Sequence, residues 1–200
     1  MNINNINVNK YPISQILDPE SKTIYEIPKY QREYIWGTKQ WEELFNDLME
    51  NGAGYFLGSI ICINTTQDTL NNPKFEVVDG QQRLTTLSLL LAALYVTLDS
   101  NRDSLDEDQQ SDILQLKRKL VIKKTQSEIR IVPQVQHKNL EDYMGLLADK
   151  KIIAPHQTPK FAGNRRIFQG YNYLKRRIDS ELEASNNKVA TMFEILEKVN

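Results

Sequence analysis

The stretch that decides the fold is VVDGQQRLTTLSLLL, residues 77–91. Its first residues have the β-branched composition of a strand. Its last residues open an apolar helix that is predicted to run from about Gln81 to Asp99. Leucines on nearly every side of this helix indicate that it lies in the middle of a domain. A strand–glycine–helix junction is therefore expected, and it carries the polar sequence Asp79-Gly80-Gln81-Gln82-Arg83.

The residue types at this junction suit the binding of an anion. The first N–H groups of the helix and its dipole favour negative charge, and Gly80 lets a ligand approach the backbone. Arg83 adds a forked donor for phosphate, and Gln81 and Gln82 add neutral donors and acceptors. Asp79 is a candidate Mg²⁺ ligand or a group that orients a nucleophilic water. The alternative is structural, with Asp79 capping the helix and Arg83 pairing with a surface carboxylate.

A second polar segment, IPKYQREYIW at residues 27–36, precedes the junction by about fifty residues. Aromatic side chains interleaved with arginine suit stacking on bases and contact with phosphate. In the alternative interpretation, the aromatic side chains pack at the edge of the core against the helix that contains Trp41. The two polar residues of the segment are Gln31 and Arg32, and their aromatic neighbours are Tyr30, Tyr34 and Trp36.

Other patterns predict the remaining elements. TIYEIP reads as a strand that stops at Pro28, and residues 55–64 and 74–79 read as two strands of a hairpin with a long connection. An amphipathic helix is expected from a Thr38 cap to Gly52. Residues 11–18 fit a short strand or a helical turn. The sequence EIRIVP fits one short strand, and the rest of the second half is mainly helical.

Composition places the chain among ordinary globular proteins, with 26% charged and 40% hydrophobic residues. The net charge of −1 gives no global signature for nucleic acid, although basic clusters occur at 117–124, 165–166 and 175–177. The single cysteine, Cys62, excludes an intramolecular disulfide, and no signal peptide or membrane-spanning segment is evident. A cytoplasmic protein without a membrane partner is expected. The sequence stops inside an amphipathic pattern, which predicts truncation at the C-terminus.

Three segments in this order resemble the N-terminal domain of GmrSD-type restriction proteins: IPKYQREYIW, YFLGSIICI and VVDGQQRLTTLSLLLAAL. The resemblance covers roughly residues 10–100, and NRRIFQGYNYLKRRI is similar to a later helix of the family. It implies an α+β fold similar to ParB and sulfiredoxin, a small mixed sheet with helices. The implied ParB-like domain is residues 1–104, and residues 105–200 form a mainly helical extension.

The resemblance also implies a function in modification-dependent (type IV) restriction, a form of phage defence. In that family the D-G-Q-Q-R motif is implicated in the binding and hydrolysis of a nucleoside triphosphate, GTP or another, with Mg²⁺. Catalytic roles are accordingly assigned to Asp79, Gln81, Gln82 and Arg83, with Asp79 as the Mg²⁺ ligand. Nucleotide or phosphate binding is assigned to Gly80, Gln31, Arg32 and Thr85. The candidates for DNA contact or base stacking are Tyr30, Tyr34 and Trp36.

In full-length members a nuclease domain of H-N-H type often follows, and these residues lack it. The expected partners are therefore DNA, modified or ordinary, a nucleoside triphosphate, and a nuclease domain or subunit outside this sequence. Two alternatives stay open. The chain is a non-enzymatic DNA-binding module that uses its tyrosines and basic helices, or it is a ParB-like nickase. The nickase would need more carboxylates beside Asp79, from Glu33, Glu76 or Asp47.

Overall fold

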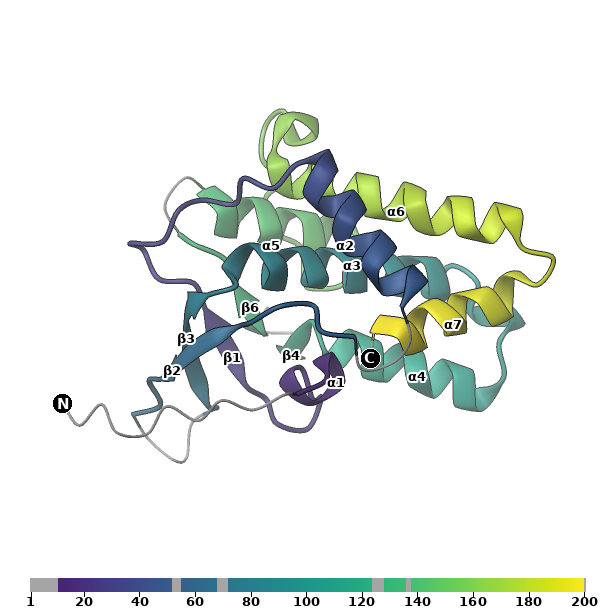
Figure 1. Cartoon of the computed structure of the whole chain (residues 1–200), viewed down its shortest axis with the longest axis horizontal. Coiled ribbons are helices and arrows are strands. Elements are labelled where there is room, and N and C mark those ends of the chain that lie inside the picture. Colours follow the sequence, from purple (N-terminus) through teal and green to yellow (C-terminus); the bar gives the residue numbers. More distant parts are fainter. Residues whose placement is uncertain (1–10, 52–54, 68–71, 124–127, 136–137, 200) are drawn as a thin grey trace.

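The computed structural model describes residues 11–51, 55–67, 72–123, 128–135 and 138–199. Figure 1 shows a small sheet beside a set of helices, so the protein has the predicted α+β class. The strands are β1 (Ile24–Glu26), β2 (Ile61–Asn64), β3 (Lys74–Asp79), β4 (Val121–Lys123), β5 (Glu128–Ile129) and β6 (Ile131–Val132). The helices are α1 (Ile13–Ile16), α2 (Thr38–Glu50), α3 (Gln81–Asp99), η1 (Arg102–Ser104), α4 (Glu107–Arg118), α5 (Asn139–Asp149), η3 (Ala162–Asn164), α6 (Arg166–Ala184) and α7 (Lys188–Val199).

The main sheet has the order β2-β3-β1-β6. Strand β1 lies parallel to both β3 and β6, and β2 lies antiparallel to β3 with Cys62 opposite Val77. The predicted hairpin is therefore confirmed. Its first strand is shorter than predicted and begins at Ile61, because residues 58–60 run past the end of β3 and pack against the start of α3.

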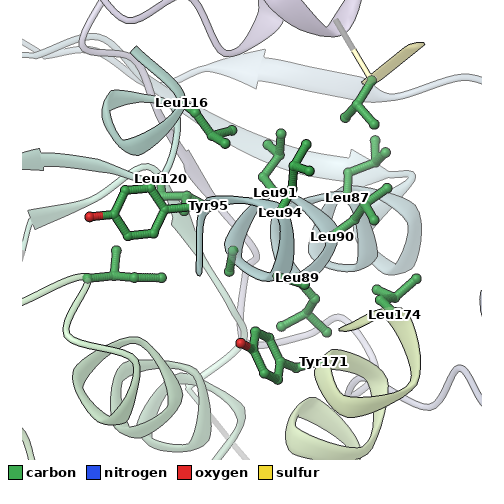
Figure 2. Close-up of a cluster of buried hydrophobic side chains, with 14 of the residues drawn as sticks. Leu87, Leu89, Leu90, Leu91, Leu94, Tyr95, Leu116, Leu120, Tyr171 and Leu174 are labelled. Atoms are coloured by element: carbon green, nitrogen blue, oxygen red, sulfur yellow. The ribbon is translucent and has the colours of Figure 1, made fainter. Parts of the chain in front are cut away.

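Helix α3 is the centre of the core, as its sequence predicted. Residues 84–95 are buried without interruption. In Figure 2, Leu89 lies on the side of α3 that faces Tyr171 of α6, and Leu91 and Leu94 lie on the side nearer Leu116 of α4. Each fully buried leucine stabilises the fold by about 2 kcal/mol. The junction at residues 79–83 is thus attached to the most firmly held helix of the protein.

One hydrophobic core joins the two predicted parts of the chain. It includes residues of α2 and α3 together with residues of α4, α5, α6 and α7. In addition, β6 from the second part completes the sheet of the first part. The boundary proposed at residue 104 does not separate two cores. Within the described ranges, no helix combines the length and the apolar character that crossing a membrane requires.

The start of α2 differs from the prediction by one residue. The N-cap of α2 is Gly37 and not Thr38, and the Gly37 N–H donates to Gln40 Oε1 at 3.0 Å. The predicted end at Gly52 lies outside the described residues. Residues 13–16 adopt the helical alternative as α1. Thr38 is instead the first residue of α2, because Gln40, three residues beyond Gly37, accepts from the Gly37 N–H as in a capping box and so places the N-cap at Gly37.

The sequence EIRIVP forms two strands and not one, because Arg130 interrupts it. Its side chain is fully buried at 0% exposure. Nε donates to Arg118 O at 2.7 Å and Nη2 to Pro19 O at 2.8 Å, while Nη1 reaches Ser21 Oγ and Thr23 O. Strand β5 before it pairs with β4, and β6 after it joins the main sheet. Arg130 therefore ties the turn before β1 to the second half of the chain.

We predict that Arg130→Lys lowers the free energy of unfolding by about 3 kcal/mol, because an ammonium group cannot reach all of these acceptors and stays buried. Urea denaturation followed by circular dichroism measures the loss. Arg118→Lys is the matched control, since the Arg118 side chain is exposed and only its carbonyl contacts Arg130. Equal midpoints for the two variants would contradict this role of Arg130.

Candidate functional site

The turn at Gly80 joins β3 to α3 in a conformation that glycine favours. Its φ angle is 86°, in the left-handed region. A Cβ atom built on Gly80 would lie 2.7 Å from Ser59 O and 3.0 Å from Ile60 Cα. Gly80 is also the N-cap of α3, and no side chain caps the helix. The exposed Asp79 is therefore not the helix cap, and no described side chain accepts from the first N–H groups of α3.

Arg83 lies on the first turn of α3 and is held by backbone. Nη1 donates to Ser59 O at 3.0 Å. The guanidinium covers Gly58, where a Cβ atom would lie 2.5 Å from Arg83 Cζ. No salt bridge among the described residues involves Arg83, so the pairing with a surface carboxylate is not observed. The positive charge of Arg83 thus lies beside the uncapped helix start, and no acid of the described ranges forms a salt bridge with it.

Residues 58–60 are part of this site, and sequence reasoning did not assign them a role. Gly58 has φ of 100°, and its lack of a side chain makes room for the Arg83 guanidinium. Ser59 contributes only its carbonyl, which makes it invisible to a search for reactive side chains. The glycine inside the strand-like pattern YFLGSIICIN was the available signal, because such glycines often mark close backbone approach.

The segment at residues 28–36, which we call the motif loop, is fastened to the junction by glutamine side chains. Gln31 Nε2 donates to Val78 O at 2.7 Å, and Gln31 Oε1 accepts from Gln81 Nε2 at 3.0 Å. Gln134, which follows β6, donates through Nε2 to Gln31 O at 2.8 Å and to Lys29 O at 3.3 Å. Gln134 is buried and was not predicted, because nothing in its local sequence distinguishes it.

Gln82 holds the far part of the motif loop. Its side chain is only 6% exposed. Oε1 accepts from the N–H groups of Ile35 at 2.9 Å and Trp36 at 3.3 Å, and Nε2 donates to Glu33 O at 2.8 Å. The two glutamines of D-G-Q-Q-R therefore both point into the protein and bind the motif loop. Neither is presented to solvent, in contrast to the catalytic placement expected from the motif.

The predicted aromatic candidates divide into buried and exposed groups. Tyr34 is 4% exposed, and its hydroxyl is hydrogen-bonded to Thr86 Oγ1 and accepts from Trp41 Nε1, each at 2.7 Å. Burial raises the pKa of Tyr34. The ring packs against the Trp41 helix, as the structural alternative held, and is not available to stack on a base. Thr85, predicted to bind phosphate, is buried as well.

Tyr30 is the aromatic residue that the motif loop exposes. Its side chain is 70% exposed, and its hydroxyl donates to Glu76 Oε1 at 2.5 Å. This hydrogen bond to a carboxylate raises the pKa of Tyr30. Trp36 is half-buried, and Arg32 is exposed between the anchored neighbours Gln31 and Glu33. The surface beside the Gly80 turn therefore carries an aromatic ring and a guanidinium on a fixed stretch of backbone.

The carboxylates near the site do not gather into a metal cluster. In the part of the chain that the structure describes, no group of three or more His, Cys, Asp or Glu side chains is placed to hold a metal ion. Glu76 binds the Tyr30 hydroxyl. Asp79 remains as a single exposed carboxylate at the turn. This donor set fits Mg²⁺ that arrives with a nucleotide, because Mg²⁺ often takes one protein carboxylate and completes its shell with phosphates and water.

Comparison with known families identifies the chain. A family model described as GmrSD restriction endonuclease, N-terminal domain, matches residues 13–200. The chain belongs to this family. Among curated proteins, none matches the chain. The family match includes the motif loop, the Gly80 turn and the helices of the second half, so the membership predicted from three short segments is confirmed. Because restriction endonucleases act on DNA, membership of this family implies an interaction with DNA.

We predict that Gly80→Ala lowers the free energy of unfolding by about 2–4 kcal/mol, because a side chain is strained at this φ angle and collides with the backbone of Ser59. Gly163→Ala is the control, since a Cβ atom there meets nothing within 4 Å. Thermal and urea denaturation compare the two variants. Similar stabilities would show that residues 58–60 do not confine the turn.

Removal of the Gln82 amide should release the motif loop and leave the core intact. In Gln82→Ala the N–H groups of Ile35 and Trp36 lose their acceptor. Each lost hydrogen bond is worth about 1 kcal/mol, so we expect exchange of each of these two amides to accelerate about 5-fold. Hydrogen–deuterium exchange resolved by residue measures the effect, with the exposed Gln15→Ala as control. Unchanged protection of both amides would rule out this anchoring role.

Proposed function

We propose that this GmrSD N-terminal domain binds a nucleoside triphosphate at the Gly80 turn and hydrolyses it, and that this activity regulates DNA restriction in phage defence. One observation carries the proposal. The uncapped start of α3 lies beside the guanidinium of Arg83, which forms no salt bridge among the described residues, at a turn that packs directly against the backbone of Ser59 and Ile60. Helix N-termini of this kind favour phosphate through free N–H groups and the helix dipole.

The proposed roles are assigned to the charged side chains of the two motifs and to the free N–H groups of α3. Arg83 and the N–H groups of the first turn of α3 would hold phosphate oxygens, and Arg32 would reach the same anion from the motif loop. Arginine binds phosphate through paired donors and keeps its charge at any physiological pH. Asp79 would hold Mg²⁺, which supplies neutralisation of the phosphate charge when it is bound. Asp79 is also the only exposed acid of D-G-Q-Q-R and the candidate for orienting the attacking water.

Gln81 and Gln82 are assigned positioning roles in this proposal. Their amides fix the motif loop against the junction, so Arg32 is carried at a set distance from Arg83. An anion between the two arginines would add attraction between the loop and α3. The motif loop is therefore the element through which nucleotide binding would be sensed by a nuclease domain or subunit. These contacts are compatible with a site specific for GTP and with a site that accepts nucleoside triphosphates in general.

A non-enzymatic DNA-binding role is the second candidate, and the exposure of Tyr30 beside Arg32 favours it. An exposed aromatic ring next to a guanidinium suits a base and its phosphate. DNA binding driven by phosphate contacts weakens steeply as salt rises, which separates it from binding of a small nucleotide. A ParB-like nickase has less support, because the described carboxylates do not gather at Asp79.

We predict that Asp79→Ala abolishes Mg²⁺-dependent hydrolysis of a nucleoside triphosphate, with a loss of roughly 10²-fold or more in rate. Because Asp79 is exposed, the free energy of unfolding should change by less than about 0.5 kcal/mol. Release of inorganic phosphate from GTP and ATP is measured with Mg²⁺ present. Glu183→Ala, at an exposed position on α6, controls for the loss of one surface carboxylate.

Titration calorimetry with GTP and ATP measures nucleotide binding separately from hydrolysis, for the unaltered chain and for two variants. Binding that persists in Asp79→Ala and is lost in Arg83→Ala supports the division of roles between the two side chains. If neither GTP nor ATP binds the unaltered chain, the proposed function is wrong. If Glu183→Ala lowers turnover as much as Asp79→Ala does, the assignment of Asp79 is wrong.

A further inference from the structure

The segment that connects α5 to α6 is basic and contains no acid. We call residues 150–166 the basic segment; it has five basic and no acidic side chains. Lys150 pairs with Asp149 at 2.9 Å, and Arg165 pairs with Asp142 at 3.1 Å, so acids of α5 neutralise two of the five. Within the described residues the other three are exposed and form no salt bridge: Lys151, Lys160 and Arg166.

Phe161 follows Lys160 in the basic segment, and its side chain does not pack against the hydrophobic core. Its side chain is 82% exposed and is not part of the hydrophobic core. Its φ angle is 55°, in the left-handed region that glycine and asparagine occupy at lower cost than phenylalanine. Gly163, two residues on, also faces open space. Stability therefore gives no reason for a large aromatic residue at this position, and a contact outside the chain would give one.

The basic segment lies next to the motif loop. Figure 1 shows the start of α6 beside the start of α2, with the segment projecting beyond the helices. A Cβ atom on Gly37, the residue that follows Trp36, would lie 3.7 Å from Arg166 Nη1. Residues between 148 and 158 also line an open hollow of about 380 Å³. The three unpaired cations and Phe161 thus belong to a projecting, uneven surface that continues from the motif loop.

We propose that the basic segment is a DNA-binding surface, in which Lys151, Lys160 and Arg166 contact backbone phosphates and Phe161 packs against a base or sugar between them. Unpaired cations complement the phosphates of a duplex, and an aromatic side chain inserted beside them adds an apolar contact. An anionic membrane would also attract lysines next to phenylalanine. It calls for a broader apolar face than one ring flanked by Lys160, Ala162 and Gly163. The proposal does not depend on nucleotide turnover at Gly80.

The test measures binding of the unaltered full chain to a labelled short DNA duplex by fluorescence anisotropy, over a range of salt concentrations and without nucleotide. Lys151→Gln combined with Lys160→Gln is compared with Lys22→Gln combined with Lys188→Gln. Both pairs remove two exposed lysines, and Lys22 and Lys151 share the left-handed backbone conformation. We expect the first pair to reduce the slope of log K against log salt by about 2 and the second to leave it unchanged.

Phe161→Ala separates the aromatic contact from the charges. We expect affinity for the duplex to fall about tenfold with an unchanged salt slope, because no phosphate contact is lost. The thermal midpoint should not decrease, since the exposed ring packs on nothing in the core. If Phe161→Ala binds the duplex as tightly as the unaltered chain does, Phe161 is not part of the DNA-binding surface.

Three results would overturn the proposal as a whole. They are no binding of the duplex by the unaltered chain, an equal loss in the two lysine pairs, and binding of anionic phospholipid vesicles in place of DNA. These results are independent of the nucleotide experiments. Absent hydrolysis with a salt slope that depends on Lys151 and Lys160 would reject the proposed function and retain the DNA surface. Hydrolysis without DNA binding would do the reverse.

Discussion

The turn at Gly80 lies so close to the backbone of Ser59 and Ile60 that no Cβ atom fits between them. This close approach fixes where β3 ends and where α3 begins. It also places Ser59 O where it accepts from Arg83, so a single constraint sets both the uncapped helix start and the neighbouring guanidinium. Helix α3 then continues into the centre of the core, which makes the position of the turn as firm as the core itself.

Neutral amides hold the motif loop to this turn, and none of the salt bridges between described residues involves the loop. Gln31, Gln81, Gln82 and Gln134 make their contacts with one another or with backbone groups. A buried amide that is hydrogen-bonded costs much less to desolvate than a buried charge. As a result, the charged groups of the two motifs form no ion pairs among the described residues, although Arg83 also donates to Ser59 O. Arg32, Arg83 and Asp79 keep their charges at the surface while the glutamines beside them do the anchoring.

Sequence patterns predicted what depends on local order along the chain. The apolar run from residue 84 predicted the bounds of α3, and β-branched and aromatic composition predicted the hairpin of β2 and β3. Where a side chain points in three dimensions was harder to predict. From the sequence, a glutamine at position 82 suits contact with a ligand as well as contact with a backbone amide. The fold of the motif loop places the Ile35 N–H against the Gln82 side chain. Gln134 is separated from the motif loop by about a hundred residues, so no local pattern could connect them.

The motif loop connects the two proposed surfaces through a short path of contacts. Gln82 fixes Ile35 and Trp36 from the start of α3, and the next residue, Gly37, lies beside the Arg166 guanidinium of the basic segment. A ligand that draws Arg32 toward Arg83 would strain or relieve the same hydrogen bonds that set the position of Gly37. The equilibrium position of Arg166 would then differ between the two states. If both proposals hold, coupling between nucleotide and DNA would require no long relay, only two arrangements of a loop that the nucleotide would contact and that ends beside Arg166.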